Sequence, residues 1–267
     1  MRPQPGFVPH VTTLGNGPRR ALALHCTLAF GGAWAGVARA LGDQVTLVAP
    51  DMPSHGQSAD WDEVSDFSDT VFEASAALLE DAPMDIIGHS FGAATALRLA
   101  VAYPEKVRSM VLAEPVLFVV GARDAPELMD GHRAGSTPFF FAISAGDREN
   151  AARLFNGMWS ARSVWEEMPE RSRAAMVRAI HVVPDTYPFL YEDSAGLLQP
   201  GRLEALDIPT VMLRGAQAQP LIQATNAGLA RRLGNATEAV IDGAGHMAPI
   251  SHPGAVAEVI AGLFARS

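Results

Sequence analysis

Short runs of branched apolar residues alternate with longer stretches in which apolar residues recur every three or four positions. The short runs cover residues 21–25, 45–49, 84–88, 107–113, 210–214 and 236–241. The longer stretches cover residues 34–41, 67–80, 91–102, 221–233 and 254–264. Continuous apolar runs are typical of buried parallel strands, and the wider spacing is typical of helices that cover a sheet. The alternation predicts an α/β fold with a mostly parallel central sheet flanked by helices, and residues 7–14 predict an additional antiparallel edge strand.

This alternation stops between residues 119 and 200, where strand-like runs are absent. Residues 147–159 and 163–180 instead predict helices, and Pro169 separates a first turn from the longer helix after it. We therefore expect an α/β core domain, formed by residues 1–118 and 201–267, that is interrupted by a helical cap (lid) subdomain of residues 119–200.

Charge and cysteine content narrow the possible partners. The 267 residues include 20 basic and 29 acidic side chains, a net charge of -9, and no basic block that could neutralise phosphates, so nucleic acid is not an expected partner. The single cysteine, Cys26, cannot form an internal disulfide. Without a signal-peptide pattern or an apolar run of about 20 residues, we expect a cytoplasmic protein with no membrane partner. The histidines show no metal-ligand spacing, so we expect neither a metal nor an organic cofactor; the oligomeric state stays unknown.

The segment Gly-His-Ser-Phe-Gly at 88–92 stands between a predicted strand and a predicted helix. In this context the G-x-S-x-G pattern is typical of a nucleophile turn, whose tightness requires glycine on both sides of the serine. The turn holds the hydroxyl above the sheet, and the N-terminus of the next helix favours negative charge there. The pattern predicts that Ser90 is a nucleophile, with an ordinary Gly/Ser turn as the alternative.

Together with three further segments, this turn resembles the α/β-hydrolase fold superfamily over nearly the whole chain. Leu-His-Cys-Thr at 24–27, with Gly-Gly-Ala-Trp at 31–34, resembles the family's His-Gly loop. Asp-Met-Pro-Ser-His-Gly-Gln-Ser at 51–58 resembles its D-x-x-G-x-G-x-S turn, and Gly-Ala-Gly-His at 243–246 resembles the loop that carries its catalytic histidine. The resemblance implies the α/β-hydrolase fold and acyl-transfer chemistry at the sheet edge.

A serine hydroxyl needs a neighbouring base, and that base needs a third group to hold it in one tautomer. We expect His246 to be the base, because its loop follows the last predicted strand and places it over the same sheet edge as Ser90. The sequence contains seven other histidines, of which His25 and His89 are expected to shape the site.

The acid departs from the usual family pattern. In most of the family it follows the strand that here covers residues 210–214, but residues 215–220 contain no carboxylate. Either the triad is lost, or the acid has moved to the end of the strand 107–113, as in the haloalkane dehalogenase branch. Glu114 is in register with that acid, and a carboxylate that closes an apolar strand needs a partner such as a histidine. We expect Glu114 to be the acid. Asp124 and Asp242 are weaker candidates, and the alternative is a Glu114 that faces solvent or a cap arginine.

The oxyanion hole requires two converging backbone N–H groups. By analogy with the family, we expect them from Phe91 and Thr27, although Cys26 replaces the usual glycine beside the latter and leaves the path of that loop open. We further expect a mostly apolar pocket under the cap. Its expected substrate-binding residues are His25, Phe30, Trp34, Phe139 and Trp159, and for most of the aromatic ones a place in the core is an equal alternative.

A serine nucleophile disfavours the dehalogenase and epoxide hydrolase reactions of this fold, in which an aspartate attacks. The leading hypothesis is therefore a carboxylesterase that cleaves small or medium acyl esters through a Ser-His-Glu triad and an acyl-enzyme, with a small-molecule ester as its partner. The sequence leaves open a lactonase, a thioesterase, a C–C bond hydrolase, a lyase, a cofactor-free dioxygenase and a non-catalytic ligand-binding protein.

Overall fold

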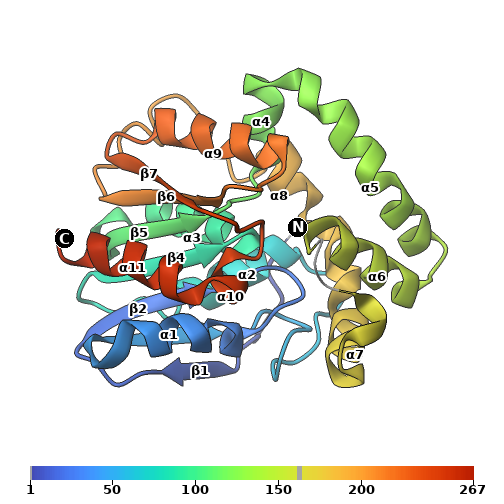
Figure 1. The fold of residues 1–267 in the computed structure, drawn as a ribbon, viewed down its shortest axis with the longest axis horizontal. Helices are drawn as coiled ribbons and strands as arrows, with labels where there is room; N and C mark the ends of the chain where they lie inside the picture. The colour runs from blue at the N-terminus through green and yellow to red at the C-terminus, as the bar shows by residue number, and fades with distance from the viewer. Residues whose placement is uncertain (1, 161–163) are drawn as a thin grey trace.

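The computed structural model describes residues 2–160 and 164–267 and centres on a seven-stranded sheet (Figure 1). The strands are β1 (Val11–Leu14), β2 (Arg19–Leu24), β3 (Val45–Pro50), β4 (Met84–His89), β5 (Val107–Ala113), β6 (Thr210–Gly215) and β7 (Ala236–Ile241). They lie in the order β1-β3-β2-β4-β5-β6-β7, with β1 antiparallel to β3 and all other neighbours parallel. The predicted mostly parallel sheet with its antiparallel edge strand is confirmed.

Alternate residues of the central strands enter two different hydrophobic clusters. Ile86 of β4 belongs to the cluster that contains helices α2 (Phe67–Ala76), α3 (Phe91–Ala102) and α9 (Pro220–Arg232). Its neighbour Ile87 belongs to the cluster that contains α1 (Ala35–Leu41) and α11 (Pro253–Phe264). Since successive strand residues point to opposite faces, a strand covered by helices on both sides reads as one continuous apolar run. The helix layers on both faces follow from this pattern (Figure 1).

A helical region is inserted between β5 and β6 and stands at one side of the sheet (Figure 1). Its helices are α4 (Phe118–Asp124), α5 (Met129–Ser144), α6 (Arg148–Trp159), α7 (Glu170–Ala179) and α8 (Tyr187–Glu192). A small core of their own, which includes Phe139, Trp165 and Ile180, packs α5, α6 and α7 together, whereas α4 and α8 pack into the main core. The predicted insertion of helices is thus confirmed, while the division at residues 118 and 200 stays a prediction.

The predicted helix over residues 163–180 is longer than the helix observed there. Residue 163 lies outside the described residues, Trp165–Glu167 form a single 3-10 turn, and α7 begins at Glu170, directly after Pro169. Proline is tolerated only in the first turn of a helix, so Pro169 separates the two segments as the sequence predicts.

Three inserted helices, α4, α5 and α8, are absent from the sequence-based prediction. The longest of them, α5, contains Gly131, Gly135 and Pro138, all of which disfavour a helix interior. It forms because Phe139 and Ala142 pack against α6, a tertiary contact that outweighs the local preference.

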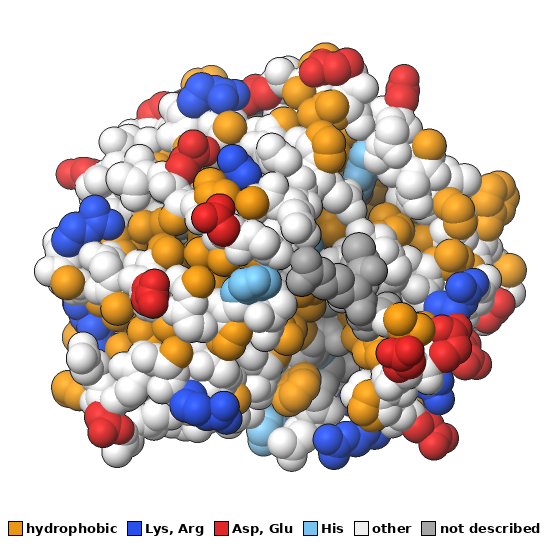
Figure 2. All heavy atoms as spheres, viewed as in Figure 1, with side chains coloured by type: hydrophobic (Ala, Val, Ile, Leu, Met, Phe, Trp, Pro, Cys, Tyr) orange, Lys and Arg blue, Asp and Glu red, His pale blue; other side chains and the backbone are white. Residues whose placement is uncertain are grey.

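The surface of the described residues carries mixed charge. Figure 2 shows Lys and Arg side chains interspersed with Asp and Glu side chains on one face of the molecule. Among the described helices, none is both long enough and apolar enough to cross a membrane.

Parallel strands bring the expected functional residues to one edge of the sheet. Ser90 directly follows β4, Glu114 directly follows β5, and His246 lies in the loop after β7. The carboxyl ends of parallel strands share an edge, and in open α/β sheets this edge is the usual place for a ligand.

Candidate active site

Ser90 occupies the sharp turn from β4 into α3, with a φ of 57° and a ψ of -118°. A side-chain-bearing residue rarely adopts such a positive φ, so the surrounding structure must hold this strained conformation. A Cβ added to Gly88 would lie 2.5 Å from the Cα of Ala93. One added to Gly92 would lie 2.4 Å from the carbonyl oxygen of Leu24. Glycine on both sides therefore lets α3 approach β4 and β2 closely enough to present the serine.

Ser90, His246 and Glu114 are hydrogen-bonded in series. The Nε2 atom of His246 lies 3.0 Å from the Oγ of Ser90, and its Nδ1 lies 2.7 Å from the Oε2 of Glu114. All three residues are buried. A carboxylate only accepts hydrogen bonds, so Nδ1 carries the imidazole proton and Nε2 offers its lone pair to the serine hydroxyl. This arrangement can remove the serine proton and stabilise the imidazolium that results.

The backbone at Glu114 turns the carboxylate toward the histidine. Glu114 has a φ of 46°, yet its N–H still donates to the carbonyl of Leu213 at 2.8 Å. The residue therefore stays attached to β6 while its chain direction changes. Its side chain is 1% exposed, which removes the possibility that it faces solvent.

The two weaker acid candidates lie elsewhere. Asp124 binds Arg231 and Arg232 at 2.8 and 2.6 Å, and hydrogen bonds from Arg232 hold the pKa of that carboxyl below its usual value. Asp242 is exposed. Neither has a hydrogen bond to His246 among the described residues, so Glu114 is the carboxylate that reaches it there.

The loop after β2 is held by a buried histidine. His25 donates from Nδ1 to the carbonyl of Cys26 at 2.7 Å and accepts the Met52 N–H at Nε2 at 3.1 Å. Burial lowers the pKa of His25, in keeping with a neutral ring that both donates and accepts. Because carbonyl and N–H point in opposite directions across a trans peptide, the bond to Cys26 turns the N–H of Thr27 away from His25.

A second buried histidine supports the next turn of this loop. His55 accepts the N–H of Leu28 at Nε2 at 3.0 Å and donates from Nδ1 to the carbonyl of Pro53 at 2.8 Å. Burial lowers the pKa of His55 to about 3, so it too is neutral. The loop keeps a defined path even though Cys26 replaces the usual glycine.

The amides of Thr27 and Phe91 are candidates for an oxyanion hole. Within the described part of the chain, neither N–H donates to another residue. Phe91 is the first residue of α3, whose N-terminal amides favour negative charge. The Phe91 ring itself is fully buried in the core, so only its backbone can serve the site.

His89 positions the loop that carries His246. Its Nε2 donates to the carbonyl oxygen of His246 at 2.8 Å, and the two rings lie 5.0 Å apart. Burial, and secondarily the charge of His246, lowers the pKa of His89 to about 3. A neutral His89 avoids placing a second positive charge beside His246.

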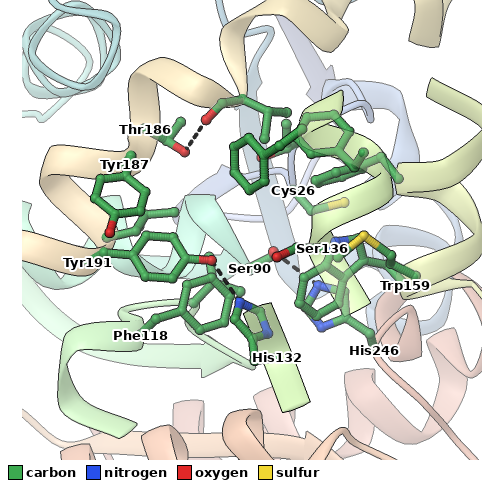
Figure 3. Close-up of a pocket in the computed structure, with 18 of the residues that line it drawn as sticks. Cys26, Ser90, Phe118, His132, Ser136, Trp159, Thr186, Tyr187, Tyr191 and His246 are labelled. Atoms are coloured by element: carbon green, nitrogen blue, oxygen red, sulfur yellow. Dashed lines mark hydrogen bonds between the residues drawn. The ribbon is translucent and has the colours of Figure 1, made fainter. Parts of the chain in front are cut away.

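A pocket of about 710 Å³, its open mouth included, adjoins Ser90 and His246 (Figure 3). No Asp, Glu, Lys or Arg is among its lining residues within the described chain. Its lining combines the sheet edge with the inserted helices: Cys26, Thr27, Ser90, Val116, Phe118, His132, Ser136, Phe139, Phe140, Phe155, Met158, Trp159, Val183, Thr186, Tyr187, Leu190, Tyr191, His246 and Met247.

Of the five residues expected to contact a substrate, two line this pocket. They are Phe139 and Trp159, and the Trp159 ring lies 4.6 Å from that of His246. The structure places the other three away from it. Trp34 is buried in the core under α1 and α11, Phe30 is 50% exposed, and His25 is buried beneath the loop that it braces. Proximity in sequence to the loop that carries Thr27 does not determine which way a side chain points.

His132 and Tyr191 are pocket residues that the sequence does not indicate. They come from α5 and α8, two helices absent from the prediction, and their side chains are hydrogen-bonded at 2.7 Å. No motif marks either residue. Over residues 2–160 and 164–267, no cluster of three or more His, Cys, Asp or Glu side chains is arranged to hold a metal ion.

Comparison with known proteins identifies the family. The Alpha/beta hydrolase family matches residues 21–259. Lipase LipV from Mycobacterium tuberculosis (strain ATCC 25618 / H37Rv) is 29% identical over 262 residues, which cover 94% of this chain and 95% of that protein. A pimeloyl-[acyl-carrier protein] methyl ester esterase from Nitrosomonas europaea is 34% identical over 117 residues, 44% of this chain and 45% of that protein. Among solved structures, 2-hydroxy-6-oxo-6-phenylhexa-2,4-dienoate hydrolase from Rhodococcus sp. strain RHA1 superimposes with a TM-score of 0.73 at 21% identity, covering 100% and 97% of the two chains. The chain belongs to the alpha/beta hydrolase family and is a distant homologue of lipases and esterases.

Proposed function

We propose that the protein is a serine carboxylesterase that cleaves small or medium acyl esters. The observation that carries this proposal is the series Ser90–His246–Glu114, with distances of 3.0 and 2.7 Å, at the wall of an apolar pocket. The homology to lipases and esterases supports the same reaction class.

In the first half of the reaction, the Oγ of Ser90 attacks the ester carbonyl carbon while Nε2 of His246 takes the hydroxyl proton. Glu114 stabilises the imidazolium through its bond to Nδ1, and the amides of Phe91 and Thr27 donate to the oxygen on which negative charge develops. When the tetrahedral intermediate collapses, the C–O bond to the alcohol breaks. The alcohol takes the proton from Nε2, and the acyl group stays on Ser90 as an ester.

Water then completes the cycle. His246 takes a proton from a water molecule whose oxygen attacks the acyl carbon, and a second tetrahedral intermediate uses the same two amides. Its collapse releases the carboxylic acid and returns the proton to Ser90.

The pocket favours an uncharged substrate. Its lining contains many aromatic rings and, within the described residues, no charged side chain other than His246 when that residue is protonated. Burying a substrate carboxylate or ammonium there without a partner would be costly. The pocket therefore suits neutral acyl chains.

The decisive experiment compares two serines that line the same pocket. Ser90→Ala should lower the hydrolysis of short-chain p-nitrophenyl esters by roughly 10³-fold or more, and it should abolish covalent labelling by a fluorophosphonate. The matched control is Ser136→Ala, because Ser136 is also buried in the lining but donates its hydroxyl to the carbonyl of Arg133. Wild-type protein that is folded but neither hydrolyses esters nor takes the label would favour a non-catalytic ligand-binding protein.

A further inference from the structure

The pocket wall that the inserted helices provide contains a hydrogen-bonded polar pair outside the proposed triad. Nε2 of His132, on the first turn of α5, lies 2.7 Å from the hydroxyl oxygen of Tyr191 on α8. Both side chains line the cavity that contains Ser90. In the view of Figure 3, the pair lies on one side of Ser90 and His246 lies on the other.

Aromatic rings surround this pair. The ring of Phe118 lies 4.6 Å from that of His132 and 4.8 Å from that of Tyr191. Tyr187 stacks on Tyr191 at 4.6 Å with an interplanar angle of 13°, and Trp159 stacks on Phe118 at 6.3 Å. The two polar groups thus stand among packed aromatic rings, which fix the orientation of both side chains.

Two other hydroxyl groups of the same wall already have a partner for their proton, whereas that of Tyr187, a side chain that is 42% exposed, has none among the described residues. Ser136 and Thr186 each donate to a backbone carbonyl three residues earlier, at 3.1 and 2.7 Å. These two hydroxyl groups donate to carbonyls of their own helical turns, so they have no proton left for a ligand.

The pair itself keeps one proton to spare. Burial, with the charge of Arg133, lowers the pKa of His132, and burial raises the pKa of Tyr191, so both are neutral near pH 7. A neutral imidazole and a phenol hold two exchangeable protons, and their mutual hydrogen bond uses one. When Nδ1 of His132 carries the imidazole proton, the Tyr191 hydroxyl donates to Nε2 and the spare proton is on Nδ1. When Nε2 carries it, Nε2 donates to the Tyr191 oxygen and the Tyr191 hydroxyl proton is the spare one.

We propose that His132 and Tyr191 form a specificity site that hydrogen-bonds a second polar, uncharged group of the substrate, a hydroxyl or a carbonyl, away from the ester being cleaved. This inference rests on the proposed esterase function and names its substrate class: neutral esters that carry an additional oxygen function. An entirely apolar ester would leave the pair without a ligand partner when it displaces water from the pocket.

The experiment uses a medium-chain p-nitrophenyl ester and its oxo-substituted analogues, with the keto group moved along the acyl chain. Wild-type protein should prefer at least one oxo ester over the unsubstituted ester by about two- to tenfold in kcat/KM. Tyr191→Phe keeps the stacked ring and should reduce that preference to about one, through KM. Tyr187→Phe is the matched control, since Tyr187 lines the same wall and its hydroxyl has no hydrogen-bond partner among the described residues; it should keep the preference.

The outcomes separate this inference from the proposed function. If wild-type protein hydrolyses esters but shows no oxo preference, or if Tyr191→Phe retains it, the specificity site is wrong and the esterase stands. If no ester is hydrolysed, the esterase is wrong. The same esters are then titrated into Ser90→Ala with tryptophan fluorescence as the readout, because Trp159 lines the pocket. If Ser90→Ala binds an oxo ester more tightly than the unsubstituted ester, and Ser90→Ala/Tyr191→Phe loses that difference, the specificity site is supported. If Ser90→Ala binds both esters equally, the specificity site is wrong.

Discussion

The carboxylate of Glu114 accepts a hydrogen bond from the backbone N–H of Gly215, with 2.8 Å between Oε1 and N. Gly215 is the last residue of β6, the strand after which the α/β-hydrolase pattern usually has its acid. Here the end of β6 supplies a backbone N–H, and Glu114, the proposed acid, reaches it from the end of β5. With Oε2 bonded to His246 at 2.7 Å, both carboxylate oxygens have a partner, which fixes the side chain in one orientation.

These two hydrogen bonds to the Glu114 carboxylate predict the effect of Glu114→Gln. Glutamine keeps the size of the side chain, but its amide has one acceptor and one donor group. If its oxygen accepts from Gly215, its NH₂ faces Nδ1 of His246 and favours the wrong tautomer. We expect kcat for ester hydrolysis to fall by roughly 10²- to 10⁴-fold, with an unchanged circular dichroism spectrum.

The matched control for this change is Asp124→Asn, which alters a carboxylate that binds two surface arginines. It should leave kcat unchanged. A large loss in Asp124→Asn combined with a retained rate in Glu114→Gln would move the acid away from Glu114.

The close approach of α3 to β2 predicts that Gly92 does not tolerate a side chain. A Cβ there would lie 2.4 Å from the carbonyl oxygen of Leu24, a backbone atom that cannot move without disturbing the sheet. Gly92→Ala should lower the free energy of unfolding by about 1–3 kcal/mol in urea denaturation and should reduce the ester hydrolysis rate through displacement of Ser90. Gly135→Ala is the control: nothing lies within 4 Å of a Cβ at this α5 position, so it should stabilise the protein by up to about 1 kcal/mol.

The parallel sheet could be predicted from sequence because its signal is local. Ile86 and Ile87 enter cores on opposite faces, so the strand needs an unbroken apolar run that is visible in the sequence itself. Helix α5 has no such signal. Its glycines and Pro138 disfavour a helix, and only its contact with α6 explains it.

The residues of the candidate site likewise divide into those that a local motif indicates and those that only tertiary contacts bring into place. Ser90 and His246 follow from motifs of a few residues, each placed by the strand before it. Trp34, although close in sequence to the loop that carries Thr27, points into the core from the 3-10 turn Gly31–Trp34. The pair His132 and Tyr191 joins residues 59 positions apart, a contact that no local pattern in a single sequence can indicate.

Arg178 connects the inserted helices to the loop after β3 and predicts a stabilising contact there. From α7 it binds the carboxylate of Asp60 at 2.7 Å and the carbonyls of Gly56 and Ser58 at 3.0 and 2.7 Å. Arg178→Met keeps the length of the side chain but removes these three bonds. We expect thermal unfolding to show that the free energy of unfolding falls by only about 1 kcal/mol, because the Arg178 guanidinium is partly solvated.

The control for Arg178→Met is Arg171→Met on the same helix, since Arg171 is exposed and has no hydrogen-bond partner among the described residues. It should leave the unfolding temperature unchanged. If the two variants unfold alike, the contacts of Arg178 contribute nothing measurable to stability.

The buried histidines predict that the protein loses stability in mild acid. Burial lowers the pKa of both His55 and His89 from 6.5 to about 3. Between these two values the unfolded chain binds protons that the folded chain does not, so their contribution to stability is complete above pH 6.5 and is lost as the pH falls toward 3. Each histidine should remove about 2 kcal/mol of unfolding free energy between pH 7 and pH 5. Urea denaturation over this range measures the summed loss of unfolding free energy from both histidines. His89→Gln should reduce that pH-dependent loss by the contribution of one histidine.

NMR provides the direct check, because the Cε1 protons of the His55 and His89 rings should not titrate above about pH 5 in the folded protein. A midpoint near 6.5 for either ring would refute the prediction for that residue.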